Sequence, residues 1–205
     1  MTRSDGKPNI EGQIVADRYF AALLLGRLEC RDAVPDLIRA TQDDPINYRA
    51  AISLGQISDQ RAIPALRKMA EECLKQRHWA GYGLALLGEQ KGFDVLAEVV
   101  ASSSSWTQRR HSVRALGAVG DPVATPTLIE ALNDDHVNVR ISAARALSKI
   151  GDPIALPALT ESLNDTEVSK IHAPTTVQYE ALKAMEAIAP ADESRAPTLF
   201  LESDS

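Results

Sequence analysis

Apolar residues recur at helical spacing along most of the chain, in stretches separated by short polar turns. Five stretches carry apolar side chains every three or four residues and are rich in alanine, which predicts helices that pack closely on their neighbours. These first helices are expected at residues 16–28, 46–57, 77–88, 108–120 and 137–151. Five shorter second helices are expected between them, at residues 32–40, 61–70, 91–100, 123–132 and 154–163. The pattern therefore predicts five consecutive helix pairs.

The second helices share a proline near their start and a leucine two residues later. The prolines are Pro35, Pro64, Pro126 and Pro157, and Asp94 takes the proline's place near the middle of the longest gap. A proline in the first turn of a helix costs no hydrogen bond. The leucines are Leu37, Leu66, Leu96, Leu128 and Leu159. This period of about 30 residues predicts a stack of repeats, because one helix pair alone cannot bury its apolar face.

Turn residues and linkers set the limits of the stack. The dipeptides Gly120-Asp121 and Gly151-Asp152 fit a left-handed glycine that ends the first helix and an aspartate that caps the second. A sixth first helix is expected at about 175–189, after the longer connection TEVSKIHAPTT. We therefore predict a flexible N-terminus at 1–13, a repeat domain at 14–189 and a flexible tail at 190–205.

Two segments carry a family resemblance. The stretches VRISAARALSKIGDPIALPALTESL (139–163) and SVRALGAVGDPVATPTLIEAL (112–132) resemble HEAT repeats, more narrowly the short HEAT-like repeat of phycocyanobilin lyase subunits. The stretch DRYFAALLLGRLECRDAVPDLI (17–38) is similar to the first repeat of such subunits. The resemblance implies an all-α, right-handed α-solenoid of about five HEAT-like helix pairs plus a C-terminal capping helix. It also implies that the second helices line the concave face.

Composition narrows the classes of partner and compartment. The formal net charge of −6 argues against nucleic acid as a main partner. No apolar stretch is long enough to cross a membrane and the N-terminus has no apolar signal region, so we expect a cytoplasmic protein with no membrane contact. The two cysteines form no CxxC motif, which fits free thiols in a reducing compartment. Cysteine and histidine show no metal-site spacing, so neither a metal nor a cofactor is expected.

One cluster of candidate binding residues stands at the start of two neighbouring first helices. Its members are Arg77, His78, Trp79, Tyr82, Trp106, Arg109, Arg110 and His111. Such residues could hold a flat anionic ligand or a protein partner by cation–π and bidentate contacts. The alternative is that the tryptophans fill gaps in the core. Exposed rings would favour a ligand site, and buried rings would favour packing.

Charged residues recur with the repeat at two positions. Arg18, Arg77, Arg109 and Arg140 stand at the same distance ahead of the proline position, and we expect each to pair with an aspartate of a neighbouring repeat. Four residues after the proline position, the charge changes from positive to negative along the chain, at Arg39, Lys68, Glu98, Glu130 and Glu161. On a concave face, this series would form a polarised groove that orients a partner.

Three functions remain open at this level, one of them a purely structural piece of a larger assembly. The first is a protein–protein interaction module, a scaffold, adaptor or chaperone-like solenoid that binds a protein on its concave face. The alternative, implied by the resemblance, is a phycobilin lyase subunit or phycobiliprotein chaperone, whose partners would be a phycobiliprotein subunit, a second HEAT-repeat subunit and a bilin. The sequence shows no catalytic constellation, so activity of the chain alone is not expected; as an enzyme it would be a bilin lyase component. The resemblance also includes deoxyhypusine hydroxylase, a branch that holds a di-iron site on His-Glu pairs. No histidine of this sequence is followed by glutamate, so that activity is not expected.

Overall fold

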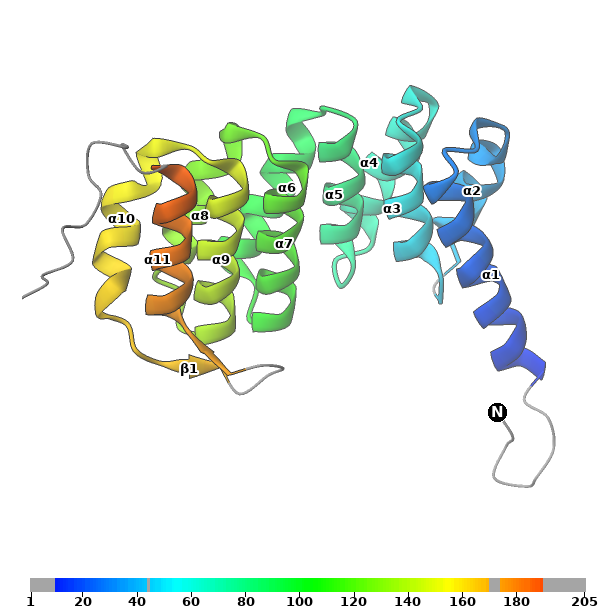
Figure 1. The fold of residues 1–205 in the computed structure, drawn as a ribbon. Helices are drawn as coiled ribbons and strands as arrows, with labels where there is room; N and C mark the ends of the chain where they lie inside the picture. The colour runs from blue at the N-terminus through cyan, green and yellow to red at the C-terminus, as the bar shows by residue number, and fades with distance from the viewer. Residues whose placement is uncertain (1–9, 44, 170–173, 190–205) are drawn as a thin grey trace, which may run out of the picture.

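Pairs of antiparallel helices follow one another along the chain (Figure 1). The computed structural model describes residues 10–43, 45–169 and 174–189. The first helices are α1 (Ile10–Arg27), α3 (Asn47–Ile57), α5 (Arg77–Leu86), α7 (Trp106–Val119) and α9 (Val137–Ile150). The second helices are α2 (Val34–Ala40), α4 (Ile63–Glu72), α6 (Gln90–Ser102), α8 (Thr125–Ala131) and α10 (Leu156–Glu161). With α11 (Val177–Ile188) at the end, the described chain confirms the predicted all-α solenoid of five pairs and a further helix.

Short 3-10 turns lead into most second helices. They are η1 (Arg31–Ala33), η2 (Gln60–Ala62), η3 (Pro122–Ala124) and η4 (Pro153–Ala155), while η5 (Ser162–Asn164) follows α10. Gly120 and Gly151 adopt the left-handed conformation that ends α7 and α9. The carboxylates of Asp121 and Asp152 then accept backbone hydrogen bonds from η3 and η4. The aspartates therefore cap the 3-10 turns that begin the second elements.

The longer connection before α11 contains a small feature that the sequence pattern did not predict. Strands β1 (Val168–Ser169) and β2 (Thr175–Thr176) pair antiparallel, with Val168 opposite Thr176. The buried Ser169 donates a hydrogen bond to Asn138 of α9. This contact fixes the connection against the body of the solenoid.

The predicted leucine ladder forms the centre of the stack. Leu66, Leu96, Leu128 and Leu159 are fully buried, and Leu37 nearly so. The buried residues form two hydrophobic cores, one reaching from α1 to α6 and the other from α5 to α11. The two cores meet at α5 and α6, which contribute residues to both.

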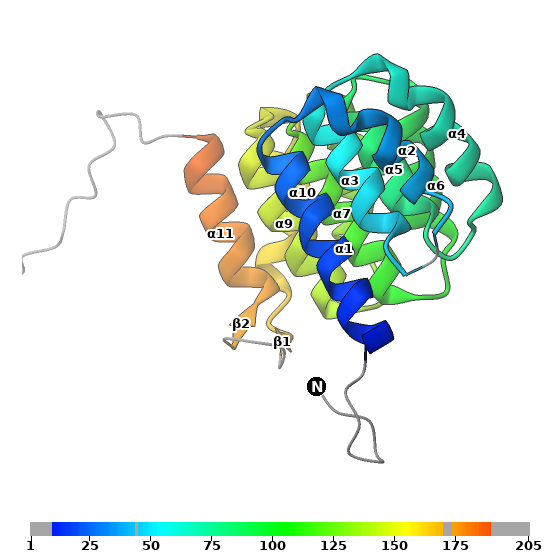
Figure 2. The ribbon, with the colours of Figure 1, turned by 90° about the vertical axis from the view of Figure 1, so that its right-hand side faces the viewer.

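The ends of the solenoid differ in part from the predicted boundaries. α1 begins at Ile10, inside the segment predicted as the N-terminal tail. The predicted tail at 190–205 and residues 1–9 lie outside the described residues. No helix in the described ranges is both long enough and apolar enough to span a membrane. Figure 2 shows α1 at one end of the stack, with no helix in front of it.

Candidate functional site

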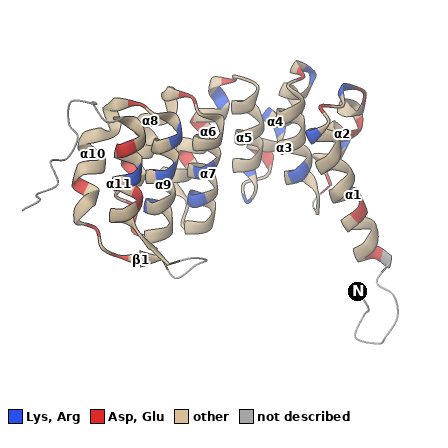
Figure 3. Ribbon diagram, viewed as in Figure 1, with Lys and Arg blue, Asp and Glu red and all other residues tan. Residues whose placement is uncertain are grey.

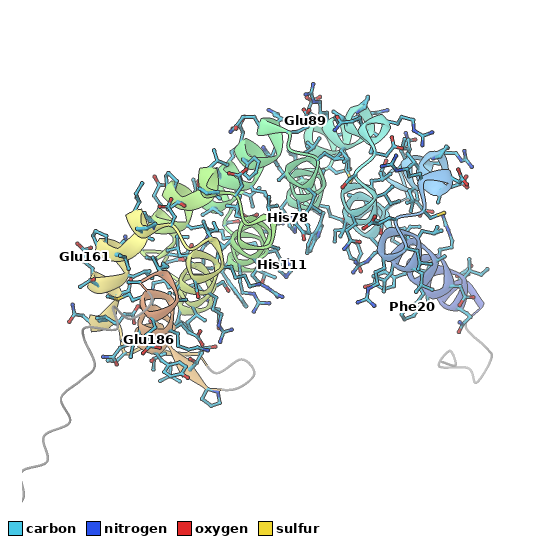
Figure 4. All side chains as sticks on the ribbon, turned by 45° about the horizontal axis from the view of Figure 1, so that its top comes forward. Phe20, His78, Glu89, His111, Glu161 and Glu186 are labelled. Carbon is cyan, nitrogen blue, oxygen red and sulfur yellow. The ribbon has the colours of Figure 1, made fainter. Side chains whose placement is uncertain are left out.

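The first helices line the concave side of the crescent. Figure 4 shows His78 of α5 and His111 of α7 on the inner side, and Glu89 and Glu161 on the outer side. Successive first helices pack on one another from α1 to α11, whereas successive second helices contact one another much less. Small residues allow this close approach: a Cβ atom on Gly83 would lie 2.6 Å from the carbonyl oxygen of Ala51. Because the first helices pack more closely than the second helices, their row forms the shorter arc, which is the concave side.

This arrangement corrects the expected polarised groove. The residues of the charge series, Arg39, Lys68, Glu98, Glu130 and Glu161, lie on second helices and thus on the convex side. Several have partners there: Arg39 pairs with Asp36, and Lys68 lies 3.9 Å from Glu72. The prediction placed the series on the wrong face, because it assigned the second helices to the inner row.

A hollow of about 550 Å³ opens on the concave face between α5, α7 and α9. Trp79 and Tyr82 of α5 form one wall. Small residues, among them Gly117 and Ala146, form the floor. The other lining residues are Arg110, His111, Arg114, Ala115, Ala118, Ser142, Arg145 and Lys149. We call this feature the basic hollow.

Like charges are repeated on both helices that carry the basic hollow. Arg110 and Arg114 lie four residues apart on α7, and Arg145 and Lys149 lie four residues apart on α9, where Figure 3 shows bands of basic residues. Such pairs destabilise a helix by about 0.2–0.5 kcal/mol each. Arg145 donates a hydrogen bond of 2.6 Å to the buried Glu180. The other three have no carboxylate partner within the described ranges.

Burial and mutual repulsion shape the electrostatics of the basic hollow. Burial, together with the charge of Arg114, lowers the pKa of Arg110, whose Nε is buried without a hydrogen-bond partner. Burial and then the charges of Arg110 and Arg114 lower the pKa of His111. A ligand carboxylate would relieve both effects, because it would pair with the cations and satisfy the guanidinium donors.

A row of aromatic rings reaches the basic hollow from the N-terminal end. Tyr19, Tyr48 and Trp79 follow one another, with neighbouring ring centroids 6.0 and 5.9 Å apart. The Trp79 ring lies 5.0 Å from the ring of His111. His78 is buried beneath them, 4% exposed, with no hydrogen-bond partner for either ring nitrogen. Trp79 is half-buried, so its exposure alone does not decide between packing and ligand binding.

Acidification should destabilise the protein through His78. Burial and the neighbouring His111 lower the pKa of His78 to about 4 from 6.5, so the unfolded chain binds the proton more tightly than the folded one. The free energy of unfolding should therefore fall by about 3 kcal/mol as the pH is lowered from 6.5 to 4. Chemical denaturation across this range measures the slope. The substitution His78→Phe should flatten the slope, and an unchanged slope would contradict this role.

The repeated arginines are structural, as expected, but their partners differ from the prediction. Arg109 Nε donates to Asp134 Oδ2 at 2.7 Å, and Arg140 Nε donates to Asp165 Oδ2 at 2.6 Å. Each aspartate follows the second helix of the arginine's own pair and does not belong to a neighbouring repeat. Arg18 pairs in the same way with Asp43. Arg109 and Arg140 also donate to the carbonyls of Ser103 and Asp134 in the preceding turn, each at 2.8 Å, so they join neighbouring repeats through the backbone.

The remaining candidate residues do not join the basic hollow. Arg77 Nη1 donates to Glu98 Oε1 at 2.9 Å, and this bond lowers the pKa of Glu98. Trp106 is half-buried and stacks on His136, with ring centroids 4.0 Å apart and planes 5° apart. The guanidinium carbon of Arg110 lies 5.5 Å from the centre of the Trp106 ring, so Trp106 contacts a residue of the basic hollow without lining it. The structure brings Trp79, Tyr82, Arg110 and His111 together, with Trp106 behind Arg110, and sets Arg77 and Arg109 aside.

The sequence matches the family model for HEAT repeats over residues 15–85 and 93–173. The chain belongs to the HEAT-repeat family. Among curated relatives, the phycocyanobilin lyase subunit alpha of Nostoc sp. strain PCC 7120 is 28% identical over 160 residues, which cover 66% of this chain and 58% of the relative. The same subunit of Microchaete diplosiphon is 32% identical over 82 residues, covering 35% of this chain and 28% of the relative. The chain thus spans less than two thirds of either relative.

A solved structure of a phycocyanin lyase is also similar to this chain. This HEAT-repeat protein is similar to a chain in the complex of CpcE and CpcF of phycocyanin lyase from Nostoc sp. PCC 7120, with a TM-score of 0.53 and 25% identity. The alignment covers 83% of this chain and 71% of that chain. The resemblance to the phycobilin-lyase class of HEAT repeats is therefore confirmed.

Sequence reasoning missed part of the basic hollow of this HEAT-repeat protein. Arg114, Arg145 and Lys149 were not among the candidates. The signal that could have found them is the like-charge pairs four residues apart, since helices usually place opposite charges at this spacing. The pairs lie on first helices, which the resemblance assigned to the convex side.

Proposed function

We propose that this HEAT-repeat protein acts as a phycobilin-lyase-type subunit that binds a bilin, and the phycobiliprotein subunit that receives it, on its concave face. The observation that carries the proposal is the basic hollow, whose aromatic wall stands beside uncompensated cations in a chain similar to phycocyanobilin lyase subunits. The similarity to lyase subunits supports a bilin as the ligand, and the basic hollow supports a site for it.

The chemistry of the basic hollow fits a bilin. A bilin is a flat conjugated tetrapyrrole that carries carboxylates. The rings of Trp79 and Tyr82 offer apolar surface for stacking on the tetrapyrrole. Arg110, Arg114 and Lys149 offer donors for its carboxylates. These residues would bind and orient the pigment, and we assign no catalytic residue to the chain.

A second HEAT-repeat subunit would complete the activity. The similar solved structure is a complex of two proteins of a phycocyanin lyase. The matched segments cover 58% and 28% of the two curated lyase subunits. Pigment binding would therefore belong to this chain, and the transfer of the bilin would belong to the assembled pair.

Reversing two charges should remove bilin binding. We expect the double substitution Arg114→Glu and Lys149→Glu to weaken binding of phycocyanobilin at least about tenfold, because each charge-assisted hydrogen bond is worth roughly 1.5–3 kcal/mol. Absorbance titration of the purified protein with phycocyanobilin measures the affinity. Capture of apo-phycocyanin, with and without the pigment, tests the protein partner.

The convex face provides a matched control. Arg39→Glu with Lys68→Glu changes the same total charge on second helices and should leave the affinity unchanged. Equal loss in both variants would show a general charge effect and contradict the basic hollow as the site. Wild-type protein that binds neither pigment nor phycocyanin subunit would overturn the lyase-type role in favour of an adaptor for another protein.

A further inference from the structure

The outward side of α1 is apolar although it faces solvent. Phe20 and Leu24 are 57% and 55% exposed, and Leu28 is still more exposed. Terminal repeats of a solenoid need a polar outer face for solubility. Asp17 and Arg27 flank the two apolar residues, and both are exposed. We call Asp17, Phe20, Leu24 and Arg27 the α1 stripe.

The equivalent positions in the following repeats show which helix the residues at the positions of Phe20 and Leu24 contact. When the first helices are aligned on Leu25 and Leu54, Phe20 and Leu24 correspond to Arg49 and Ser53 of α3. Arg49 Nη2 donates to the hydroxyl of Tyr19 at 2.7 Å, and Ser53 Oγ donates to the carbonyl of Ala22 at 2.8 Å. Both contacts bind α3 to the preceding first helix.

The same two positions have the same task in the next pair. In α5 they are occupied by Trp79 and Gly83. The Trp79 ring packs against Tyr48 of α3 on one side and His111 of α7 on the other, and the missing Cβ of Gly83 makes room for the backbone of Ala51. The α1 stripe thus occupies the interface positions of the repeat, on a helix that has no preceding helix among the described residues. A large apolar side chain there indicates a contact with another molecule.

The opposite end of the solenoid has a different character. The outward side of α11 exposes Gln178, Lys183 and Glu186 beside Tyr179 and Leu182. Head-to-tail stacking of copies would place these polar groups against the apolar α1 stripe and would build a ring or an open filament in place of a closed pair. A closed contact between two α1 helices avoids both problems.

The α1 stripe is symmetric in a way that suits such a contact. Asp17 and Arg27 lie five residues before and after position 22, and Phe20 and Leu24 lie two residues before and after it. A two-fold interface requires that residue i meets residue j and that j meets i. In an antiparallel pair of α1 helices, Phe20 would face Leu24 of the other copy, and Asp17 would face Arg27. Arg27 has no carboxylate partner in the part of the chain described here.

We propose that the partner of the α1 stripe is a second copy of this chain, and that the protein forms a two-fold dimer through antiparallel α1 helices. The pairing is independent of the basic hollow, which lies on α5, α7 and α9 and stays open. One helix from each copy makes a small interface, so we expect a reversible dimer with a dissociation constant in the range of about 1–100 µM.

Sedimentation velocity over a range of concentrations tests the dimer. The wild-type chain should shift from its mass of 22.2 kDa to twice that mass as the concentration rises. Leu24→Glu should raise the dissociation constant at least about tenfold by placing two carboxylates at the apolar contact. Ile154→Glu is the matched control, because Ile154 is 71% exposed and lies in η4 near the other end of the solenoid. It should leave the dimer unchanged.

Charge reversal identifies the register. Asp17→Arg alone should weaken the dimer, because it sets two arginines against each other, and adding Arg27→Asp should restore it. Circular dichroism confirms that each variant is folded. A wild-type chain that stays monomeric up to about 1 mM would overturn the proposal, as would a dimer that Leu24→Glu leaves intact or that the double reversal fails to restore. A complex formed only with a different HEAT-repeat protein would also overturn it. Bilin titration of the Leu24→Glu variant shows separately whether the basic hollow functions.

Discussion

Replacing Leu128 with alanine should lower the free energy of unfolding by about 2–5 kcal/mol. Leu128 is 0% exposed and lies in the C-terminal core, where it belongs to the ladder of one leucine per repeat. Truncation removes its buried methyl groups and leaves a cavity that the rigid helix pairs around it cannot close. Urea denaturation followed by circular dichroism measures the loss. Leu159→Ala should give a loss of the same size, since Leu159 is buried to the same degree.

An exposed aliphatic residue provides the comparison. Ile154→Ala, at a position 71% exposed, should change the stability by less than about 0.5 kcal/mol. A similarly small loss for Leu128→Ala would mean that α8 does not present this leucine to the core. That result would contradict the register of the repeat.

Replacing Asp134 with alanine should cost about 3 kcal/mol, because it leaves the guanidinium of Arg109 buried without its main partner. Arg109 donates to both carboxylate oxygens of Asp134, at 2.7 and 2.8 Å, and both side chains are nearly inaccessible to solvent. Thermal and urea unfolding of the single variant measure the cost.

The neighbouring aspartate offers a matched control for this pair. Asp135 also bonds to Arg109, but its side chain is 85% exposed. Asp135→Ala should therefore cost less than about 1 kcal/mol. Equal losses for the two aspartates would show that burial does not govern the strength of this ion pair. Replacing Arg109 and Asp134 together with leucine and alanine should recover part of the loss, since no unpaired charge then remains.

The sequence was informative wherever one residue type performs one local task. The leucine two residues after each proline position recurs in every repeat, and a position that is apolar in every copy of a stacked unit is expected to face the core. The glycines at 120 and 151 were expected to be left-handed, because they stand between a helix and a capping aspartate. Both properties depend on neighbours in the chain, and the structure confirms both.

Properties that depend on the curvature of the whole stack were not accessible in this way. The face to which a helix belongs is decided by which row packs more tightly, and that depends on contacts between helices, such as Gly117 of α7 against Ala146 of α9. The partners of Arg109 and Arg140 depend on how far each closing turn folds back toward its own first helix. The basic hollow depends both on which face is concave and on contacts between helices. Its residues come from three helices and meet only on the inner arc.

The division of the hydrophobic core into two parts has a mechanical consequence. Trp79 packs against the N-terminal core, whereas Tyr82 packs against the C-terminal core and the cations opposite them stand on α7 and α9. The basic hollow therefore spans the boundary between the two cores. A ligand bound there would contact both parts at once, and its binding would oppose any change in the curvature of the crescent between α5 and α7.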